Sequence, residues 1–352
     1  MKKSICVLAI AGAFGNAAVA GDNVTLYGIV DIAVAYGKAD GAKFTGVMRD
    51  GGLAGNRFGL KGSEDLGNGL SVVFALEQGY LPGSGGEHRA GRAFSRQSWA
   101  GLKGGFGTVS LGYQYAPGYL IPYNYQVMGG SAGFAPRSTL AFAGGYTISP
   151  GSGARFDNAI RYASPKFGGF DVQGIYAFHA VQSDDGSDPD RSDDDRYGIG
   201  ATYEGGPVKA GLVYHSIGTG TGADDTQELF VGVSYDLGAV KLVGSWSRKD
   251  ADGDTAADNT LFSVGAVMPV GQSGSAHLGF AKLNPRGDDN NGKSITAGYI
   301  QGLSKRTKMY AAINRLTYDD GVTYAGNPGA AVSVAVAGES ANTVLAGIFH
   351  SF

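Results

Sequence analysis

The sequence predicts an all-β chain that closes into a transmembrane antiparallel β-barrel of about 16 strands. Its last nine residues alternate between apolar and small or polar side chains and end on the aromatic Phe352. After Ala20 there is no apolar run near the roughly 18–20 residues that a spanning helix requires. Glycine (61) and aromatic residues (19 Tyr, 17 Phe) are abundant, and the mean hydropathy is −0.07, as expected when one face of each strand is apolar and the other polar. Because lipid cannot hydrogen-bond a sheet edge, such strands must close on themselves.

The N-terminus has the pattern of an export signal. Two lysines precede an apolar segment at residues 5–14, and Ala18-Val19-Ala20 is a small-residue cleavage site. We therefore expect residues 1–20 to be a cleaved signal peptide and residues 21–352 to form one barrel domain. Cleavage would also remove Cys6, the only cysteine, so neither a disulfide nor a thiolate ligand is expected in the exported chain.

The strands can be counted from the alternation of side chains and from the connections. In the first strand Val24, Leu26 and Val30 fall on the face suited to lipid, and Thr25 and Tyr27 fall on the other. Two kinds of connection then alternate along the chain, which is typical of tight periplasmic turns and larger external loops. The short ones lie at 64–69, 104–107, 165–169, 204–207, 236–239, 270–274 and 303–306, and the long ones at about 38–54, 81–91, 117–154, 182–195, 218–226, 250–258, 285–292 and 319–340. These fifteen connections imply sixteen strands.

The third long connection, about residues 117–154, is exceptional in length and content. Connections of this length are usually functional. It is rich in aromatic, small and apolar residues, and its single charge is Arg137. Such a loop is poorly suited to water outside the barrel, so we expect it to fold into the lumen. The alternatives are a loop that lies over the mouth or packs on a neighbouring subunit.

Several segments, in order, carry a resemblance to a known family. They are VTLYGIVD at 24–31, RFGLKGSEDLG at 57–67, FGTVSLG at 106–112, YASPKFGGF at 162–170, LSKRT at 303–307 and the terminal Phe352. In these segments the chain resembles the general porins of Gram-negative bacteria, in the form common in β-proteobacteria. The resemblance implies a homotrimer of sixteen-stranded barrels in the outer membrane, a third loop that narrows each pore, and a terminal Phe352 that is read by the barrel-insertion machinery.

Charge is distributed unevenly around the third loop. From His88 to Phe156 there are 69 consecutive residues without Asp or Glu. The same stretch contains six basic residues: Arg89, Arg92, Arg96, Lys103, Arg137 and Arg155. Uncompensated cations in a narrow, low-dielectric passage lower the energy of an anion and raise that of a cation. The sequence therefore predicts a passive channel for small hydrophilic solutes with a preference for anions.

The residues expected to form the constriction follow from strand parity and from the resemblance. In related porins wall arginines at the positions of Arg57, Arg96 and Arg155 face the loop, and many relatives put carboxylates on that loop. Extrapolating parity from Arg96 places Trp99 on the outer, lipid-facing side. The predicted constriction comprises Arg57, Lys61, Arg96, Arg137, Arg155 and Arg161, with Tyr119, Tyr123 and Tyr125 lining it from the loop.

Two observations temper the predicted anion preference. Tyr113 and Phe349 stand where the family commonly has arginines, which removes positive charge. Alternatively, the arginines are solvated or paired with lumenal carboxylates such as Asp31, Glu77 or Asp157, which would leave selectivity weak.

The external loops are acidic, most densely at Asp193, Asp194 and Asp195. The simplest interpretation is a hydrated surface. A sharper hypothesis is that these carboxylates bind Ca²⁺ or Mg²⁺ shared with lipopolysaccharide phosphates, because hard cations prefer oxygen ligands.

No enzymatic or nucleic-acid-binding role is expected, and no cofactor. The five histidines are scattered, and the segment 287–294 matches a phosphate-binding loop in letters but leads into a strand pattern instead of a helix. Two other roles stay open for the same barrel. One is a substrate-specific channel in which loop tyrosines stack a sugar or an aromatic solute, and the other is a surface adhesin or receptor that acts through the acidic loops.

Overall fold

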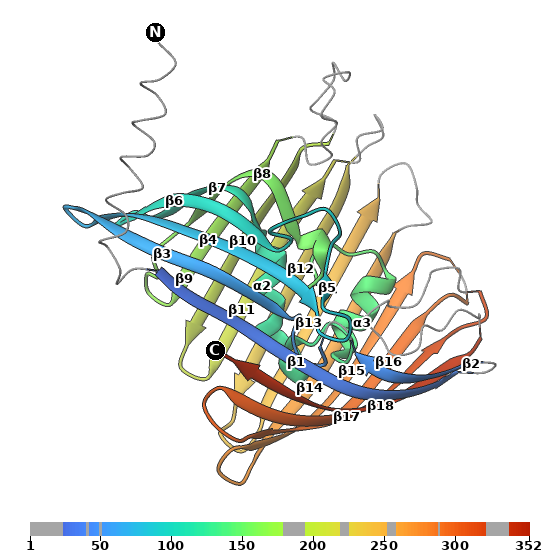
Figure 1. Ribbon diagram of the computed structural model, residues 1–352. Helices are drawn as coiled ribbons and strands as arrows, with labels where there is room; N and C mark the ends of the chain where they lie inside the picture. Colours follow the sequence, from blue (N-terminus) through green and yellow to red (C-terminus); the bar gives the residue numbers. More distant parts are fainter. Residues whose placement is uncertain are drawn as a thin grey trace.

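The computed structural model describes residues 24–39, 42–48, 51–178, 194–218, 225–251, 258–287, 289–321 and 338–352. The predicted signal peptide and Asp193 lie outside these residues. In Figure 1 the sheet curves round on itself, and the short helices α2 and α3 lie within it. None of the helices in the described residues is long and apolar enough to be a membrane span.

Sixteen strands form the wall, as predicted, and each is antiparallel to its neighbours. The barrel closes where Ile29–Ala39 of the first strand pairs with Ala341–Ser351 of the last. The seven short turns and the third long loop fall where the sequence predicts them. The wall strands are β1 (Val24–Ala39), β3 (Arg57–Gly67), β4 (Leu70–Leu81), β6 (Gln97–Gly104), β7 (Gly107–Tyr115), β8 (Arg155–Ala163), β9 (Phe170–Ala177), β10 (Arg196–Gly205), β11 (Val208–Ile217), β12 (Thr226–Asp236), β13 (Lys241–Ala251), β14 (Asn259–Val270), β15 (Gly274–Pro285), β16 (Gly292–Gly302), β17 (Thr307–Tyr318) and β18 (Ser340–Ser351).

Two further strands lie within long connections. β2 (Ala42–Met48) pairs with the last seven residues of β1, and β5 (Gly86–Glu87) pairs with the end of β4. The chain after β2 then turns into the barrel, where the buried Asp31 carboxylate accepts hydrogen bonds from the backbone N–H groups of Leu53 and Ala54, both at 2.7 Å. This inward turn brings the first loop next to the third.

The terminal residue takes part in closing the barrel. The backbone N–H of Phe352 donates to the carbonyl of Gly28 at 3.1 Å, and the N–H of Gly28 donates back to Phe352 at the same distance. The ring of Phe352 lies against Gly28, where any side chain would collide with it. The last residue of the chain is therefore part of the β1–β18 seam.

Outward-facing side chains of the wall are apolar and exposed, which is the arrangement that lipid requires. Leu26 and Val34 of β1, Leu111 of β7 and Ile199 of β10 each expose more than half of their surface. The prediction for Trp99 is wrong. Trp99 pairs with Ala75 and lies on the lumenal face, because β6 begins only at Gln97 and parity cannot be carried back to Arg96.

The third loop contains short helices and lies inside the barrel, as predicted. α2 contacts β7, β9, β10 and β11, and η1 contacts β11, β12 and β13. α3 contacts β14, β15 and β16. Most of the loop therefore packs against the side of the lumen formed by β10 to β16. Its elements are α2 (Pro117–Leu120), η1 (Ile121–Tyr125), η2 (Met128–Gly130), α3 (Pro136–Ala143) and η3 (Ser152–Ala154).

Candidate functional site

Three arginines meet at the wall facing the loop. Arg57 begins β3, Arg155 begins β8, and Arg96 immediately precedes β6. The strand register brings Arg57 and Arg96 together. Arg57 pairs with Gly79 of β4, and Glu77, two residues before Gly79 on the same strand, pairs with Gln97, the neighbour of Arg96. We call Arg57, Arg96, Arg155 and Glu77, with Tyr115 and Tyr119, the arginine cluster.

Glu77 is the one carboxylate of this cluster. Its Oε1 lies 2.7 Å from Nε of Arg96 and 3.9 Å from Nη1 of Arg57, and it also accepts a hydrogen bond from the Tyr115 hydroxyl at 2.5 Å. Tyr27 donates to the other carboxylate oxygen at 2.9 Å. Two of the three guanidinium groups thus contact this carboxylate. The cluster as defined has three cations and one anion, and hence a net charge of two positive units when its tyrosines are neutral.

The loop contributes Tyr119 to this cluster. Its hydroxyl oxygen accepts hydrogen bonds from Nη2 of Arg96 at 2.6 Å and from Nη2 of Arg155 at 3.5 Å. Its ring stacks on Tyr115 with centroids 3.9 Å apart and an interplanar angle of 9°. Burial raises the pKa of Tyr119, but the charges of Arg96, Arg155 and Arg57 lower it by more, to about 6. Tyr119 is therefore the group through which pH can change the charge of the cluster.

On the opposite side the loop rests on a row of lumen-facing glycines. A side chain at Gly211 or Gly232 would lie 2.5 Å from the ring of Tyr125, and one at Gly265 or Gly279 would lie 2.5 Å from a methyl group of Val127. Gly200 and Gly298 similarly leave room for Ile121 and Met128. We call Gly200, Gly211, Gly232, Gly265, Gly279 and Gly298 the glycine face. These glycines let the loop approach the backbone of six strands.

Buried polar groups anchor the loop to the same side. The Glu228 carboxylate accepts hydrogen bonds from the backbone N–H groups of Thr147 and Ile148, each at 2.8 Å. His215 Nε2 accepts from the N–H of Gly118 at 3.2 Å, and His277 Nδ1 accepts from that of Met128 at 3.1 Å. These side chains satisfy loop backbone groups that would otherwise be buried without partners.

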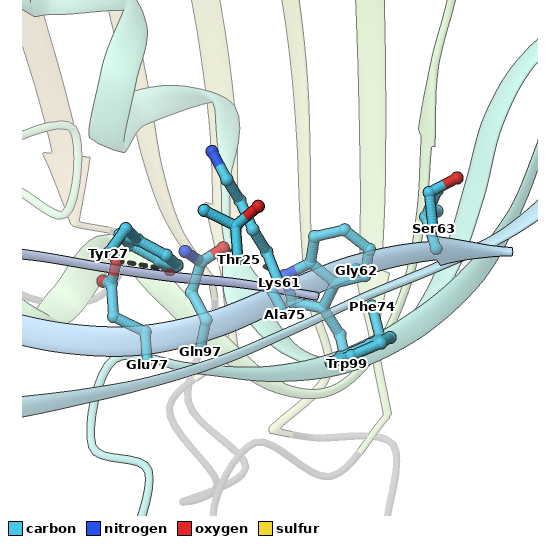
Figure 2. Close-up of a pocket in the computed structure, with 11 residues that line it drawn as sticks. Thr25, Tyr27, Lys61, Gly62, Ser63, Phe74, Ala75, Glu77, Gln97 and Trp99 are labelled. Atoms are coloured by element: carbon cyan, nitrogen blue, oxygen red, sulfur yellow. Dashed lines mark hydrogen bonds between the residues drawn. The ribbon is translucent and has the colours of Figure 1, made fainter. Parts of the chain in front are cut away.

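A pocket of about 520 Å³ adjoins the arginine cluster on the lumenal wall (Figure 2). Lys61 projects into it and lies 5.2 Å from the ring centroid of Tyr27. Trp99 forms another part of its lining, and its indole N–H donates to Gln97 at 3.0 Å. The pocket thus offers a cation beside an aromatic face.

The remaining predicted residues do not all join the cluster. Arg161 is on the lumenal face of β8 and donates to Gln173 at 2.6 Å. Tyr123 is near Tyr119, with ring centroids 6.0 Å apart. Arg137 and Tyr125 are buried between loop and wall instead of lining the lumen, because the Arg137 guanidinium packs 4.7 Å from the Phe230 ring centroid and Tyr125 fills the space above the glycines.

The two positions where the family commonly has arginines hold aromatic rings with cations beside them. Arg89 donates to the Tyr113 hydroxyl at 3.1 Å, and the guanidinium of Arg92 lies 5.0 Å from the Tyr113 ring centroid. The Lys308 ammonium lies 5.4 Å from the Phe349 ring centroid. Positive charge thus remains close to both positions.

Other lumenal carboxylates have defined partners. Asp157 forms an ion pair with Arg92 at 2.7 Å, and Asp31 receives hydrogen bonds from the first loop and from Tyr310. Glu77 and Asp157 therefore form ion pairs with arginines, which is the alternative that the sequence leaves open. In the arginine cluster as defined above, three arginines accompany one carboxylate, Glu77.

The proposed metal ligands can be compared with the structure only in part. Asp194 is buried, and Asp195 accepts a hydrogen bond from the Tyr176 hydroxyl. Within the described part of the chain, no group of three or more His, Cys, Asp or Glu side chains could hold a metal ion.

Comparison with known proteins agrees with this architecture. The profile of the Gram-negative porin family matches residues 6–321. Outer membrane porin protein 32 of Delftia acidovorans is 36% identical, with full coverage of both chains. An outer membrane porin protein of Bordetella pertussis is 28% identical over 88% of this chain and 93% of its own.

A solved structure, the anion-selective porin from Comamonas acidovorans, superposes with a TM-score of 0.77 at 32% identity, covering 94% of this chain and 99% of the other. Fold and site together define a channel-forming barrel of the outer membrane. The chain belongs to the Gram-negative porin family, whose members are channels rather than enzymes.

Proposed function

We propose that this porin is a passive diffusion channel that prefers small anions. The observation that carries the proposal is the imbalance at the arginine cluster, where Arg57, Arg96 and Arg155 have one carboxylate, Glu77, among them. The loop that faces them supplies Tyr119 and no acidic residue, since residues 88–156 contain none. Lys61 adds a further cation on the same wall.

The physical effect is an electrostatic potential that depends on the sign of the ion. A unit charge about 8 Å from an ion contributes about 0.5 kcal/mol in water, and more where low-dielectric walls confine the field. The effect is opposite for chloride and potassium, so the two contributions add in their permeability ratio. The description of the Comamonas relative as an anion-selective porin supports the same assignment.

The test is the zero-current potential of the purified protein in a planar lipid bilayer under a tenfold KCl gradient. We expect a potential whose sign corresponds to faster chloride movement. A preference for potassium would overturn the anion assignment, and an absence of conductance would overturn the role as a channel.

Binding of a specific organic solute is a second candidate function, favoured by the pocket that places Lys61 near Trp99. The tyrosine version of this hypothesis is weaker, since the hydroxyl of Tyr119 is engaged with arginines and Tyr125 is buried. Conductance that saturates, or current that is blocked by micromolar aromatic carboxylate and restored in Trp99→Ala, would support binding. Linear conductance without block would leave simple diffusion.

The expected assembly remains part of the proposal. We infer a homotrimer in contact with outer-membrane lipid, a signal peptide at residues 1–20, and a role for Phe352 as the signal read by the barrel-assembly machinery. Chemical cross-linking, N-terminal sequencing of the mature protein and the insertion yield of Phe352→Ala test these three points separately. The adhesin or receptor role would require the acidic loops, most of which lie outside the described residues.

A further inference from the structure

The outer surface of the barrel carries basic residues at one end of five strands. Each lies two positions beyond an exposed apolar or aromatic outward-facing residue, toward the end of the barrel that has the long connections. We call these residues the basic rim. Its members are Lys38 after Tyr36, Arg248 after Trp246, Arg315 after Ile313, Lys282 after Phe280, and Lys293, which precedes Ile295 on a strand that runs the other way.

Strand pairing places most of these side chains in one row. Lys282 of β15 is directly opposite Lys293 of β16. Arg315 of β17 and Lys38 of β1 are both opposite Asn342 of β18. The residue of β17 opposite Lys293 is Thr317, and Arg315 lies two residues away on the same face. The row is therefore staggered as it runs from β15 to β1, with the neutral Asn342 on β18. Like charges directly opposite on a sheet are destabilising, so Lys282 and Lys293 repel each other unless an anion lies between them.

The protein itself supplies little negative charge to this row. Lys293 lies 3.4 Å from Asp319, and Arg315 donates to the neutral side chains of Asn342 and Ser340. Lys38 and Lys282 form no ion pair with any residue that the structure describes. Arg248, farther along the wall, is paired with Asp250 at 2.6 Å.

Among the residues that the structure describes, the basic rim lies on β13, on β15 to β17 and on β1. At the same end of the wall, the outward-facing positions of β9 to β12 carry neutral residues, many of them aromatic: Tyr176, Tyr197, Tyr214 and Leu229. Aromatic side chains are the common choice at a membrane interface. The cations of the other sector are therefore a local feature of the interface rather than its general composition.

We infer that the basic rim binds the phosphate groups of lipid A, the phosphorylated glycolipid anchor of lipopolysaccharide, with its acyl chains along the apolar residues beneath. The row stands where the lipid-facing band ends, which is the depth of lipid headgroups, and its charge complements a phosphate. Acyl chains could then cover Phe280 and Ile295 while a phosphate screens Lys282 from Lys293. Lipopolysaccharide would thus contact the protein directly through basic residues, in contrast to contact through cations held by acidic loops.

The experiment measures binding of lipid A carrying two phosphates to the full-length protein in detergent, by native mass spectrometry. Lys282→Gln/Lys293→Gln should weaken binding by about tenfold or more, since each cation near an anionic headgroup contributes about 1 kcal/mol. Lys282→Arg/Lys293→Arg should retain it. The matched control is Lys305→Gln/Arg306→Gln, which removes the same charge from the short turn at the opposite end of β16 and β17 and should bind like wild type.

Three results would overturn the inference. They are equal binding by the glutamine variant when its melting temperature is unchanged, equal binding of lipid A from which both phosphates have been removed, and displacement of lipid A by inorganic phosphate at the same concentration. The last result would identify a simple anion site without a contribution from the acyl chains. If the glutamine variant does not fold, the arginine variant and the dephosphorylated lipid still test the inference.

Discussion

The two sides of the lumen wall differ in the size of their side chains. On the wall of β3, β4 and β8 long charged residues point to the lumenal side, whereas β10 to β12 and β14 to β16 present glycines at the positions that face the loop. On the first side the ring of Tyr119 packs against Arg96 and Arg155, which are almost fully buried, whereas Arg57 remains partly exposed. The second side has glycines in place of larger side chains, so the loop can pack against its backbone. Glu228, His215 and His277 hold the loop there through hydrogen bonds to its backbone. We therefore expect charge and pore width to be controlled by different strands.

This division means that substitutions on the two sides should have separable effects. A change on the glycine face should move the loop and alter conductance. A change in the arginine cluster should alter the preference between ions while the loop stays in place.

The largest effect is expected for Gly232→Leu. The new side chain would enter the space of the buried Tyr125 ring, at a cost of about 1–3 kcal/mol for overpacking. We expect the loop to be displaced from the glycine face, which should raise single-channel conductance and make loop residues accessible to protease. The matched control is Gly244→Leu, since a side chain there faces outward and its nearest contact would be at 3.6 Å. Unchanged conductance in both variants would contradict the role assigned to the glycine face.

A smaller effect is expected for Arg57→Gln. Arg57 and Arg96 are the two arginines of the cluster that pair with Glu77, and Arg57 is the more accessible, with 14% of its side chain exposed. Its Nη1 lies 3.9 Å from Oε1 of Glu77, which is a long ion pair. Loss of this charge should lower the ratio of chloride to potassium permeability by about two- to fivefold. Conductance in symmetric salt should change much less. Arg248→Gln removes an equal charge from the outer surface and should leave the permeability ratio as it is.

The smallest effect is expected from pH, through Tyr119. With its pKa lowered to about 6, the phenol is neutral at pH 5 and ionised at pH 8. The net charge of the cluster should therefore fall from two positive units to one as pH rises, and anion preference should decline over this range. Tyr119→Phe should remove this component. The ultraviolet difference spectrum near 295 nm should record one tyrosine ionising between pH 5 and 8 in the wild type only, and identical spectra would contradict the assignment.

Sequence reasoning was most successful where a local rule covers a long stretch of chain. Alternation and turn spacing predicted the sixteen strands, and the length and apolar content of residues 117–154 predicted a loop inside the barrel. Arg57, Arg96 and Arg155 were identified with the help of the family resemblance, and the structure brings them together around Tyr119 and Glu77.

The errors occurred where long-range contacts decide the outcome. Arg137 and Tyr125 are buried because strands far away in sequence present glycines and Phe230 to them. The parity prediction for Trp99 fails because Arg96 precedes β6, so the direction of its side chain does not define the two faces of that strand. The sequence does contain a signal for the glycine face, since glycines recur at lumen-facing positions of successive strands. The direction of His215 and His277 toward the loop backbone left no local signal.

The most direct measurement compares the zero-current potential of the wild type with that of Asn124→Asp under a tenfold KCl gradient. Asn124 is an exposed residue of η1, and the change adds one carboxylate to the loop at almost constant shape. If the absence of negative charge opposite Arg57, Arg96 and Arg155 determines the preference, the variant should lose much of its selectivity for chloride. The same change at Asn342, on the outer surface, should have no effect. A potential equal to that of the wild type in Asn124→Asp would contradict the account.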